Sequence, residues 1–140
     1  LKISLNGLES TTVYKQLAEG SFEAVILDWT GTYPDPEAYL TPLLSCTLIK
    51  KETETCLKGE AVFSGSFWAN TKVQELLEKS EEIDGPKRLN TLIKVEYYAS
   101  EGNAYLPVWL VKPKAWSLKE ISAPEFSSNG MIILRKLRRE

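Results

Sequence analysis

The sequence has 140 residues, with 17 lysines and arginines, 19 aspartates and glutamates, a formal net charge of −2 and no histidine. The length suits a single domain over residues 1–140, and 43% hydrophobic with 26% charged residues is an ordinary globular composition. The nearly neutral charge gives no electrostatic reason to expect nucleic acid as a partner. The absence of histidine excludes Ser-His and Cys-His catalytic pairs and every zinc site that uses histidine. We therefore expect no histidine-based catalysis. A bound metal or cofactor is likewise not expected.

The first part of the chain is predicted to form a strand, a helix and a second strand. Residues 2–8 alternate apolar and polar side chains over a short stretch, which is typical of a β-strand. Ser10 is a candidate N-cap for a helix that ends at Gly20. Residues 22–27 are a nearly unbroken apolar run, which predicts a strand in a sheet covered on both faces. Together these elements predict a βαβ unit with parallel strands.

An irregular loop and a short helix are predicted next. Residues 28–36 contain two prolines and a glycine, which disfavour regular structure. A helix is predicted from Pro36 to Leu44, with Asp35 as its cap and Glu37 in its first turn. The loop thus follows the carboxyl end of a predicted strand, where ligands gather in open α/β sheets.

The two cysteines, Cys46 and Cys56, allow two interpretations. They are either unrelated thiols or a disulfide that closes the polar stretch 47–55. A bridge across so short a loop would add about 2–3 kcal/mol of stability, and it would place the chain in an oxidising compartment. Two cysteines without histidine cannot supply the four ligands of a structural zinc site. The spacing alone leaves the choice open.

Two helices are predicted in the middle of the chain. Asn70 is the candidate cap of the first. Its apolar residues share one face and are Val73, Leu76, Leu77 and Ile83. Asp84 is the candidate cap of the second, with Pro86 in the first turn and Gly102 at the end.

The last third of the chain is predicted to contain two more strands. Residues 105–111 form one of them, and Pro107 favours an edge position or the end of a ladder. Residues 119–140 are predicted to be a tail that contains a last strand at 131–134. The basic residues at 135–139 predict a solvated end, with nucleic-acid binding as the weaker alternative.

The candidate ligand-binding residues are Trp29, Thr30, Gly31, Thr32 and Tyr33. Aromatic faces offer apolar contact area, while the hydroxyl groups and the amides next to glycine offer directed hydrogen bonds. The alternative is a rigid strand-to-helix turn in which Trp29 packs into the core.

Part of this loop resembles an enzyme motif. The stretch Ile26-Leu27-Asp28-Trp29-Thr30-Gly31-Thr32 resembles the nucleophile motif of haloacid dehalogenase-like phosphatases and phosphonatases. The resemblance implies Asp28 as nucleophile, with Thr30 in the place of the usual second aspartate. That chemistry also needs a lysine and a further acidic pair that hold Mg²⁺. After Asp35 the only remaining aspartate is Asp84, at a predicted helix cap.

Most of the chain resembles another family, the family 5 extracellular solute-binding proteins. These are the oligopeptide-, dipeptide- and nickel-binding components of ABC importers. Four motifs and the cysteine pair occur in the order of that family. The motifs are Tyr33-Pro34-Asp35-Pro36-Glu37-Ala38-Tyr39-Leu40 preceded by Trp29, Phe67-Trp68-Ala69-Asn70, Asp84-Gly85-Pro86-Lys87-Arg88-Leu89, and Leu106-Pro107-Val108-Trp109.

This resemblance implies an α/β chain, the C-terminal lobe fragment of a type II periplasmic-binding-protein-like fold. The βαβ unit would be followed by helices and further strands. The chain would correspond to the last part of the family's protein, which agrees with a start at Leu1 instead of an initiator Met. The implied function is capture of a peptide-like or other small solute in a cleft between two lobes, without enzymatic chemistry. The implied partners are the permease subunits of the importer and the N-terminal part of the same protein. The implied location is periplasmic or extracellular, membrane-associated through the importer.

The resemblance also assigns residues. It implies that Trp29, Thr30, Gly31 and Thr32 face the cleft, with Tyr33 beside them. Peptide-binding members carry an Asp three residues after the Trp, where it pairs with the amino terminus of the peptide. Here that position is Thr32, and a hydroxyl cannot supply the same charge-assisted bond. We therefore expect a ligand that is not held through a free α-amine.

Two further implications concern the cysteines and the alternatives. Cys46 and Cys56 fall where dipeptide-binding members carry a disulfide, so the resemblance implies that they are bridged. Besides the solute-binding protein and the phosphatase, a third possibility is a plain interaction module. In that case the apolar surface would meet another protein.

Overall fold

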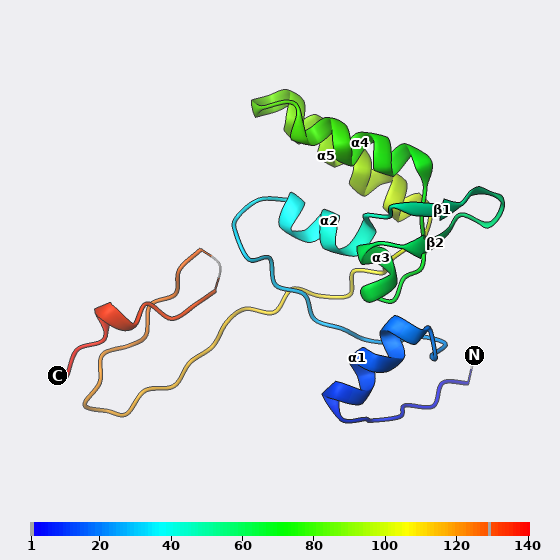
Figure 1. The fold of residues 1–140 in the computed structure, drawn as a ribbon. Helices are drawn as coiled ribbons and strands as arrows, with labels where there is room; N and C mark the ends of the chain where they lie inside the picture. Colours follow the sequence, from blue (N-terminus) through cyan, green and yellow to red (C-terminus); the bar gives the residue numbers. More distant parts are fainter. Residues whose placement is uncertain (1, 129) are drawn as a thin grey trace.

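The computed structural model describes residues 2–128 and 130–140. Its centre is a pair of adjacent helices, α4 (Thr71–Glu81) and α5 (Gly85–Glu101), which are joined by a short turn (Figure 1). Asn70 caps α4 as predicted, because its side-chain oxygen accepts the backbone N–H groups of Lys72 and Val73. Asp84 occupies the N-cap position of α5 as predicted, but its side chain makes no capping hydrogen bond. None of the helices in the described part of the chain is long and apolar enough to cross a membrane.

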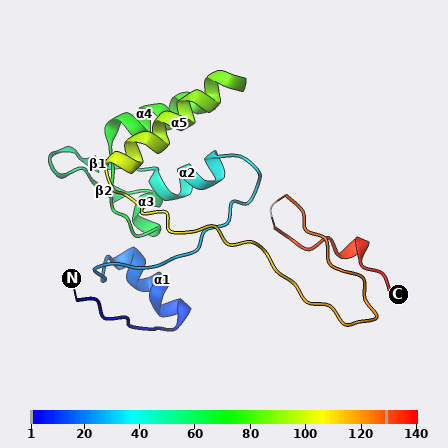
Figure 2. The ribbon, with the colours of Figure 1, turned by 180° about the vertical axis from the view of Figure 1, so that it is seen from behind.

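A third helix, α2 (Glu37–Leu44), packs against α5 and completes the main core. Seen from behind, α2 lies below the α4–α5 pair (Figure 2). The buried side chains of this core come from all three helices and are Leu44, Val73, Leu76, Leu77, Leu92 and Val95. The α4 residues among them recur at helical spacing, so one face of α4 is buried and the other is polar.

A small disulfide-linked unit lies beside this core. It contains β1 (Leu48–Lys50), the 3₁₀ turn η1 (Lys51–Thr53), β2 (Thr55–Lys58) and the short helix α3 (Glu60–Phe63). The two strands pair antiparallel. Gly59 has φ +142°, and a Cβ there would lie 2.7 Å from the Cα of Cys46. The turn from β2 into α3 therefore requires glycine.

The first helix, α1 (Ser10–Glu19), packs on this unit through Leu17. A Cβ at Gly65 would lie 2.5 Å from Leu17 Cδ2, so the absence of a side chain at Gly65 permits the contact. The helix ends at Gly20 as predicted, because this residue adopts the left-handed conformation with φ 66°. Ser10 was predicted as the cap, but it is the first helical residue and Glu9 precedes it.

The predicted βαβ unit is wrong. The described residues contain one sheet, the antiparallel pair β1 and β2, and residues 2–8, 22–27 and 105–111 lie outside helices and strands. A strand is stable only when its N–H and C=O groups pair with a neighbour. No neighbouring strand for these segments exists within the described residues. The fold is therefore mixed α and β, with helices forming most of its core.

The predicted strand at 131–134 is also wrong. Ile132 forms only an isolated bridge with Phe126, and residue 134 begins the 3₁₀ turn η2 (Leu134–Lys136). Two bridged residues do not make a ladder, so the segment gains no regular strand pairing.

The basic tail does not extend freely into solvent. The backbone of Arg138 pairs with Ser122, since the Ser122 N–H donates to the Arg138 carbonyl at 2.8 Å and the Arg138 N–H donates to Ser122 Oγ at 2.9 Å. Ile121 and Arg139 also form an isolated bridge. The predicted solvated end is thus correct for the exposed arginine side chains and wrong for the backbone that carries them. Figure 1 shows this orange and red region away from the helices.

Candidate functional site

The loop that carries the predicted ligand-binding residues folds against the start of α2. The indole N–H of Trp29 donates to the Ala38 carbonyl at 3.0 Å. Gly31 is buried beneath the Tyr39 ring, and a Cβ at this position would lie 2.6 Å from Tyr39 Cε2. Only glycine allows the loop to approach the helix so closely. Two of the five predicted residues are therefore held in place by α2.

The other three predicted residues lie on the surface. Thr30 and Thr32 are exposed, and neither hydroxyl makes a hydrogen bond within the described residues. Tyr33 is also exposed, while its carbonyl accepts the Asp35 N–H at 2.9 Å. Trp29 is half-exposed, so the alternative in which it packs into the core is not what the structure adopts. The loop presents two hydroxyl groups and two aromatic rings to solvent.

Asp35 was predicted as the cap of α2, but Pro36 occupies the N-cap position and the helix begins at Glu37. The Asp35 carboxylate nevertheless binds the start of α2, and it also binds a side chain that the sequence did not predict. Its Oδ1 accepts the Glu37 N–H at 2.9 Å. Arg88, in the first turn of α5, donates to both carboxylate oxygens of Asp35 at 2.7 and 3.1 Å, and to Glu37 Oε2 at 2.6 Å. This fork joins the loop and the start of α2 to α5 across 53 positions of sequence. No local pattern predicts a pairing at that separation.

The fork also changes the acidity of its members. The hydrogen bond from Arg88 holds the pKa of the Asp35 carboxyl below its usual value, and the Glu37 backbone N–H adds to this effect. Asp35, and to a smaller degree Glu37, raises the pKa of Arg88 above its already high value. Asp35 and Arg88 therefore stay charged at neutral pH. Arg88 is occupied by Asp35 and Glu37 together.

Next to this loop lies an apolar groove. It has a volume of about 410 Å³ and lies between α2, α5 and the segment that follows α5. Its lining is mostly apolar and includes Tyr39, Leu40, Leu43, Ala99, Tyr105 and Pro107. Glu96 and Ser100 add polar groups. Such a composition suits the burial of an apolar ligand group with a few directing hydrogen bonds.

Tyr105 and Tyr39 connect the groove to neighbouring parts of the fold. The Tyr105 hydroxyl hydrogen-bonds Ser64 Oγ at 2.8 Å, which fixes the start of the segment after α5. Tyr39 lines the groove and also covers Gly31. Through Tyr39 the groove and the loop at 29–33 form one continuous surface. We take this surface as the candidate site, and we call it the Tyr39 groove.

A second hollow, of about 500 Å³, lies within the C-terminal region. It is lined by Ser122, Ala123, Glu125, Lys136 and Arg138. Lys136 is already paired with Glu125. Lys136 and Arg138 belong to the basic stretch 135–139, and none of the lining residues belongs to the motifs of either family resemblance.

The residues named by the phosphatase resemblance lie on the surface. Asp28 is exposed where the loop begins, beside Trp29. In the described part of the chain, no three His, Cys, Asp or Glu side chains gather closely enough to hold a metal ion. Thr30, which would take the place of the second aspartate, is exposed as well.

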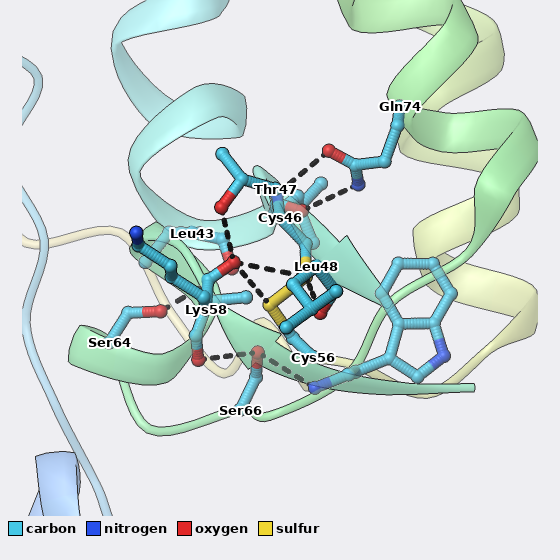
Figure 3. The surroundings of a disulfide bond; sticks show 12 residues. Leu43, Cys46, Thr47, Leu48, Cys56, Lys58, Ser64, Ser66 and Gln74 are labelled. Carbon is cyan, nitrogen blue, oxygen red and sulfur yellow. Dashed lines mark hydrogen bonds between the residues drawn. A yellow bond between two sulfur atoms is a disulfide. The ribbon is translucent and has the colours of Figure 1, made fainter. Parts of the chain in front are cut away.

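The cysteine pair supports the site from the other end of α2. Cys46 and Cys56 form a disulfide (Figure 3). Their Cα atoms are 5.8 Å apart. Gln74 on α4 accepts the Cys46 N–H at 2.8 Å and donates to the Leu44 carbonyl at 2.9 Å. The Gln74 side chain thus anchors the end of α2 to α4. The predicted bridge is confirmed, and it joins the chain just after α2 to β2. Such a bridge is compatible with an extracellular location.

The sequence matches no protein-family model, and no curated protein or solved structure is significantly similar to it. The motifs of the chain and the geometry of the Tyr39 groove are therefore the features that bear on function. The groove, the loop beside it and the disulfide below it are the features that a function must explain.

Proposed function

We propose that this chain is the C-terminal part of a family 5 solute-binding protein of an ABC importer, with the type II periplasmic-binding-protein-like fold. The observation that carries the proposal is the continuity between the loop at 29–33 and the Tyr39 groove. The motif resemblance assigns that loop to ligand binding, and the groove beside it has the size and apolar lining of a small-molecule site. The role requires binding and no chemistry.

The side chains near the groove limit the chemical class of the proposed solute. Asp35 lies near the loop, but its carboxylate is occupied by Arg88 and is not free to bind an ammonium group. Thr32 carries a hydroxyl where the family's peptide binders have a carboxylate. The proposed ligand is therefore a peptide-like or other small solute with an apolar group, which is not held through a free α-amine.

The remaining parts of the proposal concern location and partners. The disulfide supports an oxidising compartment, the periplasm or the cell exterior. The proposed partners are the permease subunits of the importer and the N-terminal part of the same protein. That N-terminal part would supply the opposite wall of the cleft.

The test is retention of a ligand by the protein in native mass spectrometry. The protein is incubated with a pool of tripeptides and, in parallel, with the same pool acetylated at the amino terminus. Both pools are expected to be retained, because the α-amine is not the recognised group. Ala99→Phe places a large side chain in the groove and should abolish retention.

Ala18→Phe, at an exposed position of α1, is the matched control and should leave retention unchanged. Circular dichroism verifies that both variants are folded. Retention of the free pool alone would contradict the inference about the α-amine. Retention that is equal in Ala99→Phe and the original protein would remove the Tyr39 groove as the site.

A further inference from the structure

The charges of the chain are separated along the sequence. Residues 112–140, the basic region, carry seven lysines and arginines against three glutamates, whereas residues 1–111 carry ten basic against sixteen acidic residues. The formal net charge is therefore +4 in the basic region and −6 in the rest of the chain. Figure 1 and Figure 2 both show the orange and red part of this region away from the helices. Such an asymmetry is typical of a region that binds an anionic partner.

The basic side chains of this region are exposed, and most of them are unpaired. Lys136 forms an ion pair with Glu125. The other six make no ion pair and no side-chain hydrogen bond with the described part of the chain, and they are Lys112, Lys114, Lys119, Arg135, Arg138 and Arg139. The hollow of about 500 Å³ brings Lys136 and Arg138 together beside Ser122. Because lysine and arginine pair readily with phosphate oxygens, these groups suit the headgroup of an anionic lipid.

Large apolar side chains lie among these cations and are also exposed. Their exposed fractions are 87% for Trp116, 74% for Leu118, 67% for Met131 and 72% for Leu134. Trp116 and Leu118 stand within the basic stretch 112–119. Leu134 directly precedes Arg135. The basic region therefore offers positive charge and apolar surface together, which is the combination that a lipid surface accepts.

We propose that the basic region binds the surface of an anionic lipid bilayer. Its cations pair with the negative headgroups, while Trp116, Leu118 and Leu134 enter the boundary between headgroups and acyl chains. Tryptophan is favoured at this boundary because its ring is apolar and its N–H is polar. The negative charge of residues 1–111 is repelled by the same surface, so the helical part of the chain is turned away from the bilayer. The proposal does not depend on solute binding.

Two other partners match the positive charge and fit the rest of the region less well. Nucleic acid would use the cations, but leucine and methionine side chains do not stack on bases. The disulfide also favours an oxidising compartment. A second copy of this chain would offer the Tyr39 groove, whose lining holds a single carboxylate, Glu96. One carboxylate does not balance seven cations, whereas an anionic bilayer supplies many negative headgroups.

The test is co-sedimentation of the protein with vesicles at low ionic strength. One set of vesicles contains phosphatidylcholine and phosphatidylglycerol, and the other contains phosphatidylcholine alone. We expect binding to the anionic vesicles to be at least ~100-fold tighter, because each basic residue near an anionic surface raises the affinity about five-fold. Added salt should weaken this binding, since it screens the charges.

Two triple variants separate the basic region from the overall charge. The first is Arg135→Gln/Arg138→Gln/Arg139→Gln, and it should weaken binding to the anionic vesicles about 100-fold. The matched control changes the net charge equally at exposed lysines of α4 and α5, and it is Lys79→Gln/Lys87→Gln/Lys94→Gln. The control should leave the binding nearly unchanged, because these lysines lie outside the basic region. Circular dichroism verifies that both variants are folded.

The apolar contact is tested separately. Trp116→Ala should weaken binding to the anionic vesicles about ten-fold, because a large buried side chain is lost. An unchanged affinity in this variant would contradict the insertion that distinguishes a bilayer from other anionic partners.

Four further results would overturn the proposal. Binding that is equal on the two kinds of vesicle, or absent from both, would mean that the anionic bilayer is not recognised. An equal loss in the lysine control would assign the attraction to the overall charge. Tighter binding to a DNA duplex than to the anionic vesicles, at the same salt concentration, would make nucleic acid the partner. An oligomer that the arginine variant dissociates, and that does not bind vesicles, would make a second copy the occupant.

Discussion

At the scale of single residues, Arg88 is the side chain that most directly links the candidate site to the helical core. It donates to Asp35 and Glu37 at the start of α2 while it lies in the first turn of α5. Bidentate arginine–carboxylate contacts are stronger and more directional than ordinary ion pairs. The partial exposure of all three side chains limits their contribution to stability.

Replacing Arg88 tests this link. Arg88→Gln should lower the melting temperature at pH 7 by about 2–5 °C, as measured by calorimetry. The exposed neighbour Lys87, changed to Gln, is the control and should shift it much less. An equal shift in both variants would show that the fork does not stabilise the fold.

The stabilisation by the fork should also depend on pH. The pKa of Asp35 is lower in the folded state than its ordinary value, so its contribution is present above about pH 4 and is lost as the pH falls below it. The difference in melting temperature between the original protein and Arg88→Gln should therefore shrink in acid. A difference that grows below pH 4 would contradict this sign.

Asp28 distinguishes the binding role from the phosphatase alternative. We expect the protein and its Asp28→Asn variant to hydrolyse p-nitrophenyl phosphate at the same background rate with Mg²⁺ present. The reason is that a carboxylate nucleophile at phosphorus needs a bound metal ion to offset the charge. Turnover that Asp28→Asn abolishes would make the chain an enzyme.

At the scale of elements, the predicted helices are present in the structure, whereas the strands predicted at 2–8, 22–27, 105–111 and 131–134 are absent from it. A helix satisfies most of its backbone hydrogen bonds within its own segment. Asn70 therefore marks the start of α4, and Gly20 marks the end of α1, without help from distant residues. A strand depends on a neighbour, and residues 22–27 have none within the described chain. In the sheet that the described residues form, β1 and β2 are partners within the same hairpin. A disulfide reinforces that hairpin.

Removal of the disulfide should destabilise the chain measurably. The double variant Cys46→Ala/Cys56→Ala should lose about 2–3 kcal/mol in urea unfolding, because the unfolded chain regains the freedom of the closed loop. Reductant should have a similar effect on the original protein and none on the double variant. A reductant effect of equal size in both would assign the loss to something other than the bridge.

At the scale of the whole molecule, a well-packed centre is joined to long segments that pack poorly. The core of α2, α4 and α5 is buried, whereas residues 105–111 and much of the N-terminal segment are exposed and apolar. Natural monomers rarely expose contiguous apolar surface on this scale. The folded centre and the uncovered segments should therefore respond differently to a protease.

Limited proteolysis with chymotrypsin measures that difference in the isolated chain. We expect the first cuts at Trp109, Leu110 and Trp116, which are exposed in a segment without secondary structure. A fragment that contains α2 to α5 should persist. First cuts within α4 or α5 would show that the helical centre is no more stable than the segments around it.

The sequence by itself determined the features that depend on near neighbours. These are the cap at Asn70, the end of α1 at Gly20, the helical spacing of the α4 core and the absence of histidine-based chemistry. Only the tertiary structure decided that Arg88 binds Asp35 and that Tyr39 joins the loop at 29–33 to a groove. It also decided that the apolar segments at 22–27 and 105–111 remain unpaired. The physical reason is that caps and helices are local, whereas ion pairs, grooves and strands depend on residues far away in sequence.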